Sequence, residues 1–174
     1  MKQFFPTLLL GILFLTLQTT FFVSPTIYWV RPDLLLILTL SLALLYPPLS
    51  GGIIVFFLGY LMDLFSGNGF GLYTFSRPLL FFVAQLFKDH IYLESFLLRS
   101  SFVFLFGLAE GIVLLLILKA LNPEPLGNLY PLFFIRFLPQ VFCTALLSPL
   151  FFSLFRKGYF LLYVHPKRGL GDRS

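Results

Sequence analysis

The sequence predicts an all-α polytopic membrane protein. Of its 174 residues, 59% are hydrophobic and only 11% are charged, and the mean hydropathy is +0.96. A soluble domain usually has about a quarter of its residues charged, so the natural solvent of this chain is a bilayer. At about 20 residues for each spanning helix, five or six helices use up the whole chain. We therefore expect a single integral membrane domain of about six transmembrane helices.

The order of hydrophobic runs and breaks sets the expected spans. The first run follows Lys2 like a signal peptide, but it has full spanning length and no small-residue cleavage motif follows it. The second run is short and ends at Pro47 and Pro48, which cannot continue a helix. Arg77-Pro78 is expected to kink or interrupt the fourth span. The expected spans are 4–23, 34–46, 51–65, 72–87, 96–118 and 130–155, followed by a basic tail, 156–174.

The basic residues predict the orientation. With six spans both termini lie on one side, which collects Lys2, Lys88, Arg99 and the basic residues of the tail, whereas the other side has Arg31 and Lys119. Cytoplasmic loops carry the excess of Lys and Arg, so both termini are expected in the cytoplasm, with the tail against anionic membrane lipids. No basic stripe is interleaved with exposed aromatic residues, so we do not expect nucleic-acid binding.

Ionisable residues inside the spans are the first candidates for function, because each costs several kcal/mol unless it is paired or solvated. They are Asp63, Arg77, Glu110 and Arg136, with Arg31 and Asp33 at the start of the second span. Their spacing predicts two ion pairs, one of Asp63 with Arg77 and one of Glu110 with Arg136. Two interpretations stay open: the pairs hold the helices in register, or they line a cavity or face a partner's helix.

The segment "GNGFG" places glycines at Gly67, Gly69 and Gly71 between two spans. A dinucleotide fingerprint needs a strand and a different glycine spacing, so phosphate binding is disfavoured. The glycines instead favour a tight reversal at the membrane interface, where left-handed backbone angles are needed. Gly107 and Gly111 form a GxxxG motif around Glu110, which allows close approach of another helix.

Catalytic and metal chemistry find no support in the sequence. The only cysteine, Cys143, lies in a hydrophobic run, and the only histidines are His90 and His165. No serine has a histidine in a plausible triad arrangement. We expect no catalytic residue, no metal site and no cofactor.

Residues 31 to 87 resemble the rod shape-determining protein MreD family. Members have a Pro-Asp opening an apolar helix, then a glycine-containing helix ending in Asp, a small-residue turn, and Gly-Leu starting the next helix. The matching elements here are Pro32-Asp33, Gly59 with Asp63, Ser66-Gly67 and Gly71-Leu72. Tyr73 departs from the pattern, because members commonly have His or a similar polar residue there.

The resemblance implies a bacterial inner-membrane component of the cell-elongation machinery without enzymatic activity. Its implied partner is the single-span protein MreC, alongside the actin-like MreB, RodA and a class B penicillin-binding protein. The implied fold is similar to that of the six-helix substrate-binding S components of energy-coupling-factor vitamin transporters.

That fold supplies an alternative function, a solute-binding membrane subunit of a transporter. S components typically carry Ala-x-x-x-Ala contacts in the first helix, and the first span here has no alanine. An interaction protein predicts that Asp63→Ala or Arg77→Ala disrupts partner capture and cell shape. A transporter subunit predicts lost uptake with normal shape.

Overall fold

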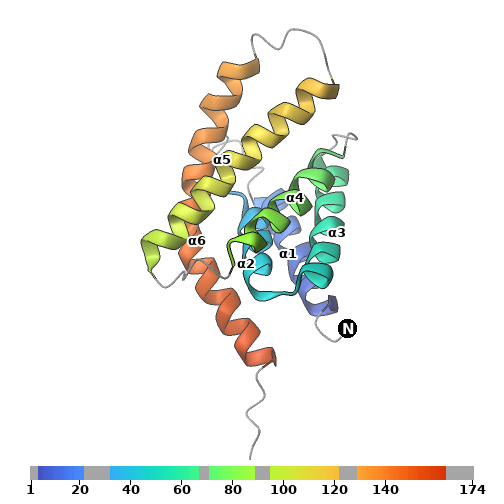
Figure 1. The fold of residues 1–174 in the computed structure, drawn as a ribbon, viewed down its shortest axis with the longest axis vertical. Helices are drawn as coiled ribbons and strands as arrows, with labels where there is room; N and C mark the ends of the chain where they lie inside the picture. The colour runs from blue at the N-terminus through green and yellow to red at the C-terminus, as the bar shows by residue number, and fades with distance from the viewer. Residues whose placement is uncertain (1–3, 22–31, 67–70, 89–94, 122–128, 164–174) are drawn as a thin grey trace, which may run out of the picture.

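The computed structural model describes residues 4–21, 32–66, 71–88, 95–121 and 129–163, and these ranges contain helices and no strand (Figure 1). The predicted all-helical fold of six helices is confirmed. The helices are α1 (Phe4–Phe21), α2 (Leu34–Leu45), α3 (Pro48–Ser66), α4 (Leu72–Leu86), α5 (Phe96–Leu121) and α6 (Leu129–Tyr163). The predicted likeness to S components stays a prediction.

Two helix ends differ clearly from the predicted spans. α3 begins at Pro48 and not at residue 51, because the first position of a helix does not use the N–H that proline lacks. α6 continues to Tyr163, so residues 156–163 of the predicted tail are helical.

Prolines inside α4 and α6 do not interrupt these helices. Pro78 lies within α4, and Pro139 and Pro149 lie within α6. A proline leaves the carbonyl four residues earlier without its helical donor. At Pro149 this carbonyl belongs to Ala145, and the Ser148 hydroxyl donates to it at 2.7 Å. A local side chain thus replaces the lost backbone bond, as a bilayer requires.

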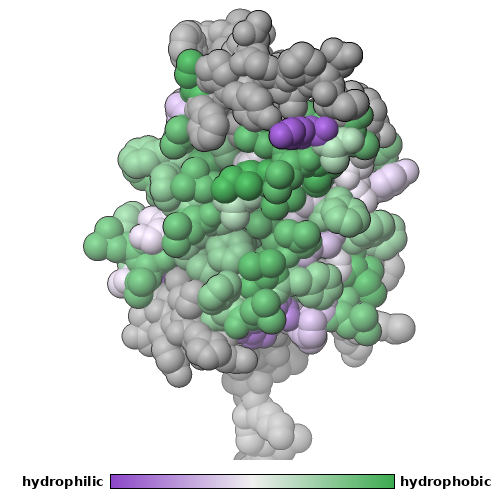
Figure 2. Space-filling view, turned by 45° about the horizontal axis from the view of Figure 1, so that its top comes forward, coloured by the Kyte–Doolittle hydropathy of each residue, from purple (hydrophilic) through white to green (hydrophobic). Residues whose placement is uncertain are grey.

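Three helical segments are long and apolar enough to cross a membrane within the described residues. They are α3, α5 and residues Phe137–Phe155 of α6, and the shorter apolar segments Pro6–Thr20 and Leu34–Leu45 accompany them. Figure 2 shows a face of the molecule covered mainly by hydrophobic side chains. These features identify a membrane protein.

α2 is the central helix of the bundle. It contacts each of the other five helices, and its residues 34–43 are all buried. A helix that is apolar on every side is expected to be buried in this way. Its 12 residues span about 18 Å, well short of the roughly 30 Å of bilayer hydrocarbon. The polar groups at its ends therefore need partners inside the protein.

The other helices surround α2 in alternating directions. α3 and α4 form an antiparallel pair, in which Gly59 lies against Tyr73 and Gly51 against Phe81. α5 and α6 form a second pair, in which Gly107 and Gly111 lie against α6. The start of α1 and the end of α6 lie at the lower end of the bundle in Figure 1. The first residue of α1 and the last residue of α6 thus lie on the same side of the bundle.

Candidate functional site

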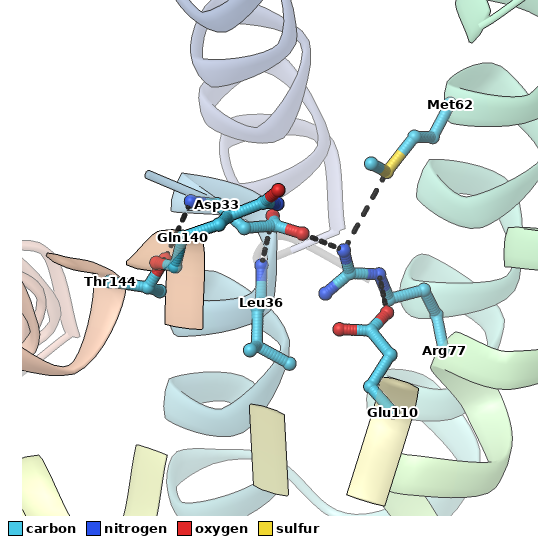
Figure 3. A network of polar contacts seen from close by, with 7 residues as sticks. All are labelled: Asp33, Leu36, Met62, Arg77, Glu110, Gln140 and Thr144. Carbon is cyan, nitrogen blue, oxygen red and sulfur yellow. Dashed lines mark hydrogen bonds and ion pairs between the residues drawn. The ribbon is translucent and has the colours of Figure 1, made fainter. Parts of the chain in front are cut away.

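A buried cluster of charged side chains joins three helices at the start of α2 (Figure 3). Asp33 precedes α2, Arg77 belongs to α4 and Glu110 to α5. Arg77 is 0% exposed, and Asp33 and Glu110 are 5% and 2% exposed. The cluster therefore lies inside the bundle. Each charge there needs a partner within the cluster, because it has little contact with solvent.

Asp33 links the start of α2 to both α4 and α6. Its Oδ1 accepts a hydrogen bond from the backbone N–H of Leu36 at 2.9 Å, which makes Asp33 the N-cap of α2. Its Oδ2 accepts a hydrogen bond from Nη2 of Arg77. Its backbone N–H donates to the Thr144 hydroxyl at 2.9 Å, and that hydroxyl donates to the Gln140 carbonyl at 2.7 Å. Asp33 thus caps the buried start of α2 and links it to α4 and α6.

Arg77 lies between the two carboxylates. Its Nε is 3.0 Å from Oε1 of Glu110, close enough for an ion pair although the atoms are not aligned as a hydrogen bond. Met62 Sδ lies 3.7 Å from Nη2, and the Tyr73 ring centre lies 5.6 Å from Cζ. Guanidinium supplies five donors in a fixed plane, which suits a bridge between carboxylates on different helices.

Asp63 has a different role from the one predicted. Its carboxylate accepts hydrogen bonds from the backbone N–H of Tyr73 at 3.0 Å and of Thr74 at 2.7 Å, and from the Thr74 hydroxyl. The predicted Asp63–Arg77 ion pair is therefore wrong. The first N–H groups of α4 have no helical acceptor, and an acid at this end also matches the helix dipole.

The corner between α3 and α4 depends on two glycines. Gly71 has a φ of +66°, the left-handed conformation expected for this turn. A Cβ on Gly59 would lie 2.5 Å from the Tyr73 carbonyl oxygen, so only glycine lets the two backbones come this close. Gly67 and Gly69 lie outside the described residues. The corner is thus set by backbone geometry and by the Asp63 cap.

The predicted Glu110–Arg136 pair stays a prediction. Glu110 faces Arg77, while the side chain of Arg136 lies outside the described residues. The flanking GxxxG motif has a packing role, because a Cβ on Gly107 or Gly111 would lie 2.7 or 2.4 Å from side chains of Val141 and Phe137. Close approach of α6 explains the motif.

The other end of α2 has a polar clasp that the sequence analysis missed. The Tyr46 carbonyl accepts hydrogen bonds from Nε2 of Gln85 at 2.9 Å and from Nζ of Lys88 at 3.4 Å, and the Tyr46 hydroxyl lies 2.6 Å from that of Thr7. A cation suits the negative end of a helix dipole. The short length of the second hydrophobic run was the available signal, because both ends of such a helix need partners.

The arrangement suits structural support of the bundle. The charged side chains of the cluster are buried against one another, and no group of three potential metal-ligating side chains occurs among the described residues. What the cluster can do is hold α2, α4, α5 and α6 in one register.

The comparisons with known proteins place the chain in a family. The family model described as "rod shape-determining protein MreD" matches residues 1–159. No curated protein and no solved structure matches the chain. The matched residues include all three members of the buried cluster and the corner between α3 and α4. The chain therefore belongs to the MreD family of rod shape-determining proteins.

Proposed function

We propose that this protein is a non-enzymatic scaffold of the bacterial cell-elongation machinery in the inner membrane, with both termini in the cytoplasm. Membership of the MreD family implies a role in rod shape determination. The match over residues 1–159 is the observation that carries the proposal, because it includes almost the whole helical bundle.

The scaffold binds the transmembrane segment of MreC and helps to organise peptidoglycan synthesis, with RodA, a class B penicillin-binding protein and MreB as further members of the assembly. The structure supports a binding role through the way it uses its charges. Asp33, Asp63, Arg77 and Glu110 are all buried, and each has a hydrogen bond or an ion pair within the bundle. The outer surface of the helices is left largely apolar, as a surface for lipid and for a partner's helix requires.

Affinity capture of the detergent-solubilised protein tests this function. We expect MreC to be recovered with the wild-type chain and lost with Arg77→Ala, because this change leaves two buried carboxylates without their cation. Lys119→Ala is the matched control, since Lys119 is exposed in the last turn of α5 and should retain capture. Recovery of an energy-coupling transport module without any shape-complex protein would contradict the proposal.

A second variant separates loss of the fold from loss of the charges. Asp33→Asn, Arg77→Met and Glu110→Gln together remove all three charges, keep similar side-chain volumes, and leave an N-cap residue before α2. If the cluster acts only by holding the bundle together, this triple variant still captures MreC. Capture by the triple variant together with loss in Arg77→Ala is the expected combination.

A further inference from the structure

The outer side of α3 and α4 is apolar but short. Its exposed apolar side chains run from Leu49 to Phe65 on α3 and from Phe75 to Leu86 on α4, and we call this surface the α3–α4 face. At about 1.5 Å for each residue, the α3 part is about 24 Å long, and the whole of α4, with 15 residues, is about 22 Å long. The hydrocarbon of an ordinary bilayer is about 30 Å thick, so the face is about 6–8 Å too short.

Polar groups bound the α3–α4 face at both ends. Lys88 follows the end of α4, and its Nζ lies 3.4 Å from the Tyr46 carbonyl oxygen. At the other end Ser66 is exposed directly after Phe65. Because the Lys88 amine is bonded within the bundle, this side chain does not reach outward to adjust the length of the face.

Tilt of the helices does not correct the mismatch. α4 lies obliquely to α3 in Figure 1, so the two helices are not both perpendicular to the membrane, and tilt shortens a helix along the membrane normal. α5 differs, because its exposed apolar side chains run from Phe96 to Leu121, over about 38 Å. A long helix fits a bilayer by tilting, whereas a short face is matched when the bilayer thins or when a partner covers the face.

The shape of the α3–α4 face favours lipid over a partner's helix. A spanning helix of about 20 residues is about 30 Å long, so it would extend past the face and leave the mismatch in place. Between α3 and α4 lies an open apolar groove of about 430 Å³, and Gly52, Ile53, Phe56 and Phe82 are among its lining residues. A flexible acyl chain can fill such a groove and end where the face ends.

We propose that the α3–α4 face binds phospholipids with short acyl chains and thins the bilayer beside it. Mismatch between a protein and the surrounding hydrocarbon costs free energy for each Å, and this cost selects the shorter chains. The binding follows from the lengths of the helices and is independent of the scaffold function.

Spin labels at the two ends of α4 measure the depth of these ends in the bilayer. Each label is attached to one introduced cysteine, Phe75→Cys or Leu86→Cys, in a Cys143→Ala background, and the two native side chains are 69% and 75% exposed. The bilayers are dimyristoleoyl, dioleoyl and dierucoyl phosphatidylcholine, which become thicker in this order. We expect both labels to stay at the same shallow depth in all three, because the bilayer adapts to α4.

Leu105→Cys is the matched control, since Leu105 is 64% exposed near the middle of the long apolar run of α5. Its label should become deeper by about half of the increase in bilayer thickness. Labels at Phe75→Cys and Leu86→Cys that deepen in step with this control would overturn the proposal. Labels immobilised by a second protein chain would overturn it as well, because protein and not lipid would then cover the face.

Photolabelling of the wild-type chain tests the lipid preference without any variant. The bilayer contains equal amounts of dimyristoleoyl and dierucoyl phosphatidylcholine, and the photoreactive group is placed on one lipid at a time. We expect residues 49–65 and 75–86 to be labelled about twofold more by the shorter lipid. Equal labelling by the two lipids would contradict the proposal. MreC is absent from these bilayers, so a failure here leaves the scaffold function to its own test.

Discussion

Replacement of Arg77 by methionine is the sharpest test of how the bundle is held together. Arg77 is fully buried, and its Nε lies 3.0 Å from Oε1 of Glu110 while Nη2 bonds to Asp33. At an effective dielectric constant of about 20, one such contact has a Coulomb energy of about 5 kcal/mol. Desolvation offsets part of this energy, and removal of one partner from a buried pair costs about 3–5 kcal/mol.

Thermal unfolding in detergent, followed by circular dichroism, measures the effect. A loss of about 3–5 kcal/mol in a chain of this size lowers the Tm by roughly 6–20 °C. The triple variant with Asp33→Asn and Glu110→Gln should recover most of this loss, because a neutral cluster of similar volume leaves no charge unpaired. Lys119→Met, at the exposed end of α5, should stay within about 0.5 kcal/mol of wild type.

Two results would refute this reasoning. One is an Arg77→Met variant as stable as the Lys119→Met control. The other is a triple variant no more stable than Arg77→Met alone, which would mean that packing around the guanidinium, and not its charge, holds α2, α4 and α5 together.

Further variants address the corner and the proline site, with the same unfolding assay. Asp63→Ala should cost about 1–3 kcal/mol, because it leaves two N–H groups of α4 without an acceptor, and Asp63→Asn should cost less; equal costs would argue against the cap. Gly59→Ala should cost about 1–3 kcal/mol, because its Cβ would collide with the backbone of Tyr73. Gly71→Ala should cost about 1 kcal/mol, because alanine disfavours the positive φ at this position. A Gly59→Ala variant as stable as the wild type would contradict the close approach of α3 and α4. Ser148→Ala should cost about 1 kcal/mol in the wild type and nothing in a Pro149→Ala background, where the backbone N–H is restored; equal costs in both would exclude the proposed compensation.

The helices could be predicted from the sequence, because each is a largely apolar run and most of the breaks between the runs are polar or contain proline or glycine. The run 34–46 even indicated a helix too short to span, which is the central α2. The end of α6 could not be predicted in the same way. Residues 156–163 are rich in charged and aromatic side chains, and a basic segment reads equally well as a tail or as a helix that leaves the membrane.

The charge cluster could be predicted only in part. Charged residues inside a membrane are expected to form pairs. This principle singled out Asp33, Arg77 and Glu110 as candidates, and the three do lie together. The predicted partner of Arg77, Asp63, was wrong because it was chosen as a neighbour along the chain. Asp33 and Arg77 are 44 residues apart and meet because the central α2 runs parallel to α4. The position of α2 beside α4 depends on how all six helices pack together. It could not be predicted from a short segment of the sequence.

The cell shape of a rod-shaped host without its chromosomal copy of this chain tests the central claim most directly. We expect cells that lose their rod shape, and restoration of rods by the wild-type chain and by the charge-neutral triple variant. Arg77→Met should fail to restore rods, because less of this variant is folded in the membrane. Rods of normal width in the absence of the chain, together with lost uptake of a solute, would contradict a scaffold and support a transporter subunit.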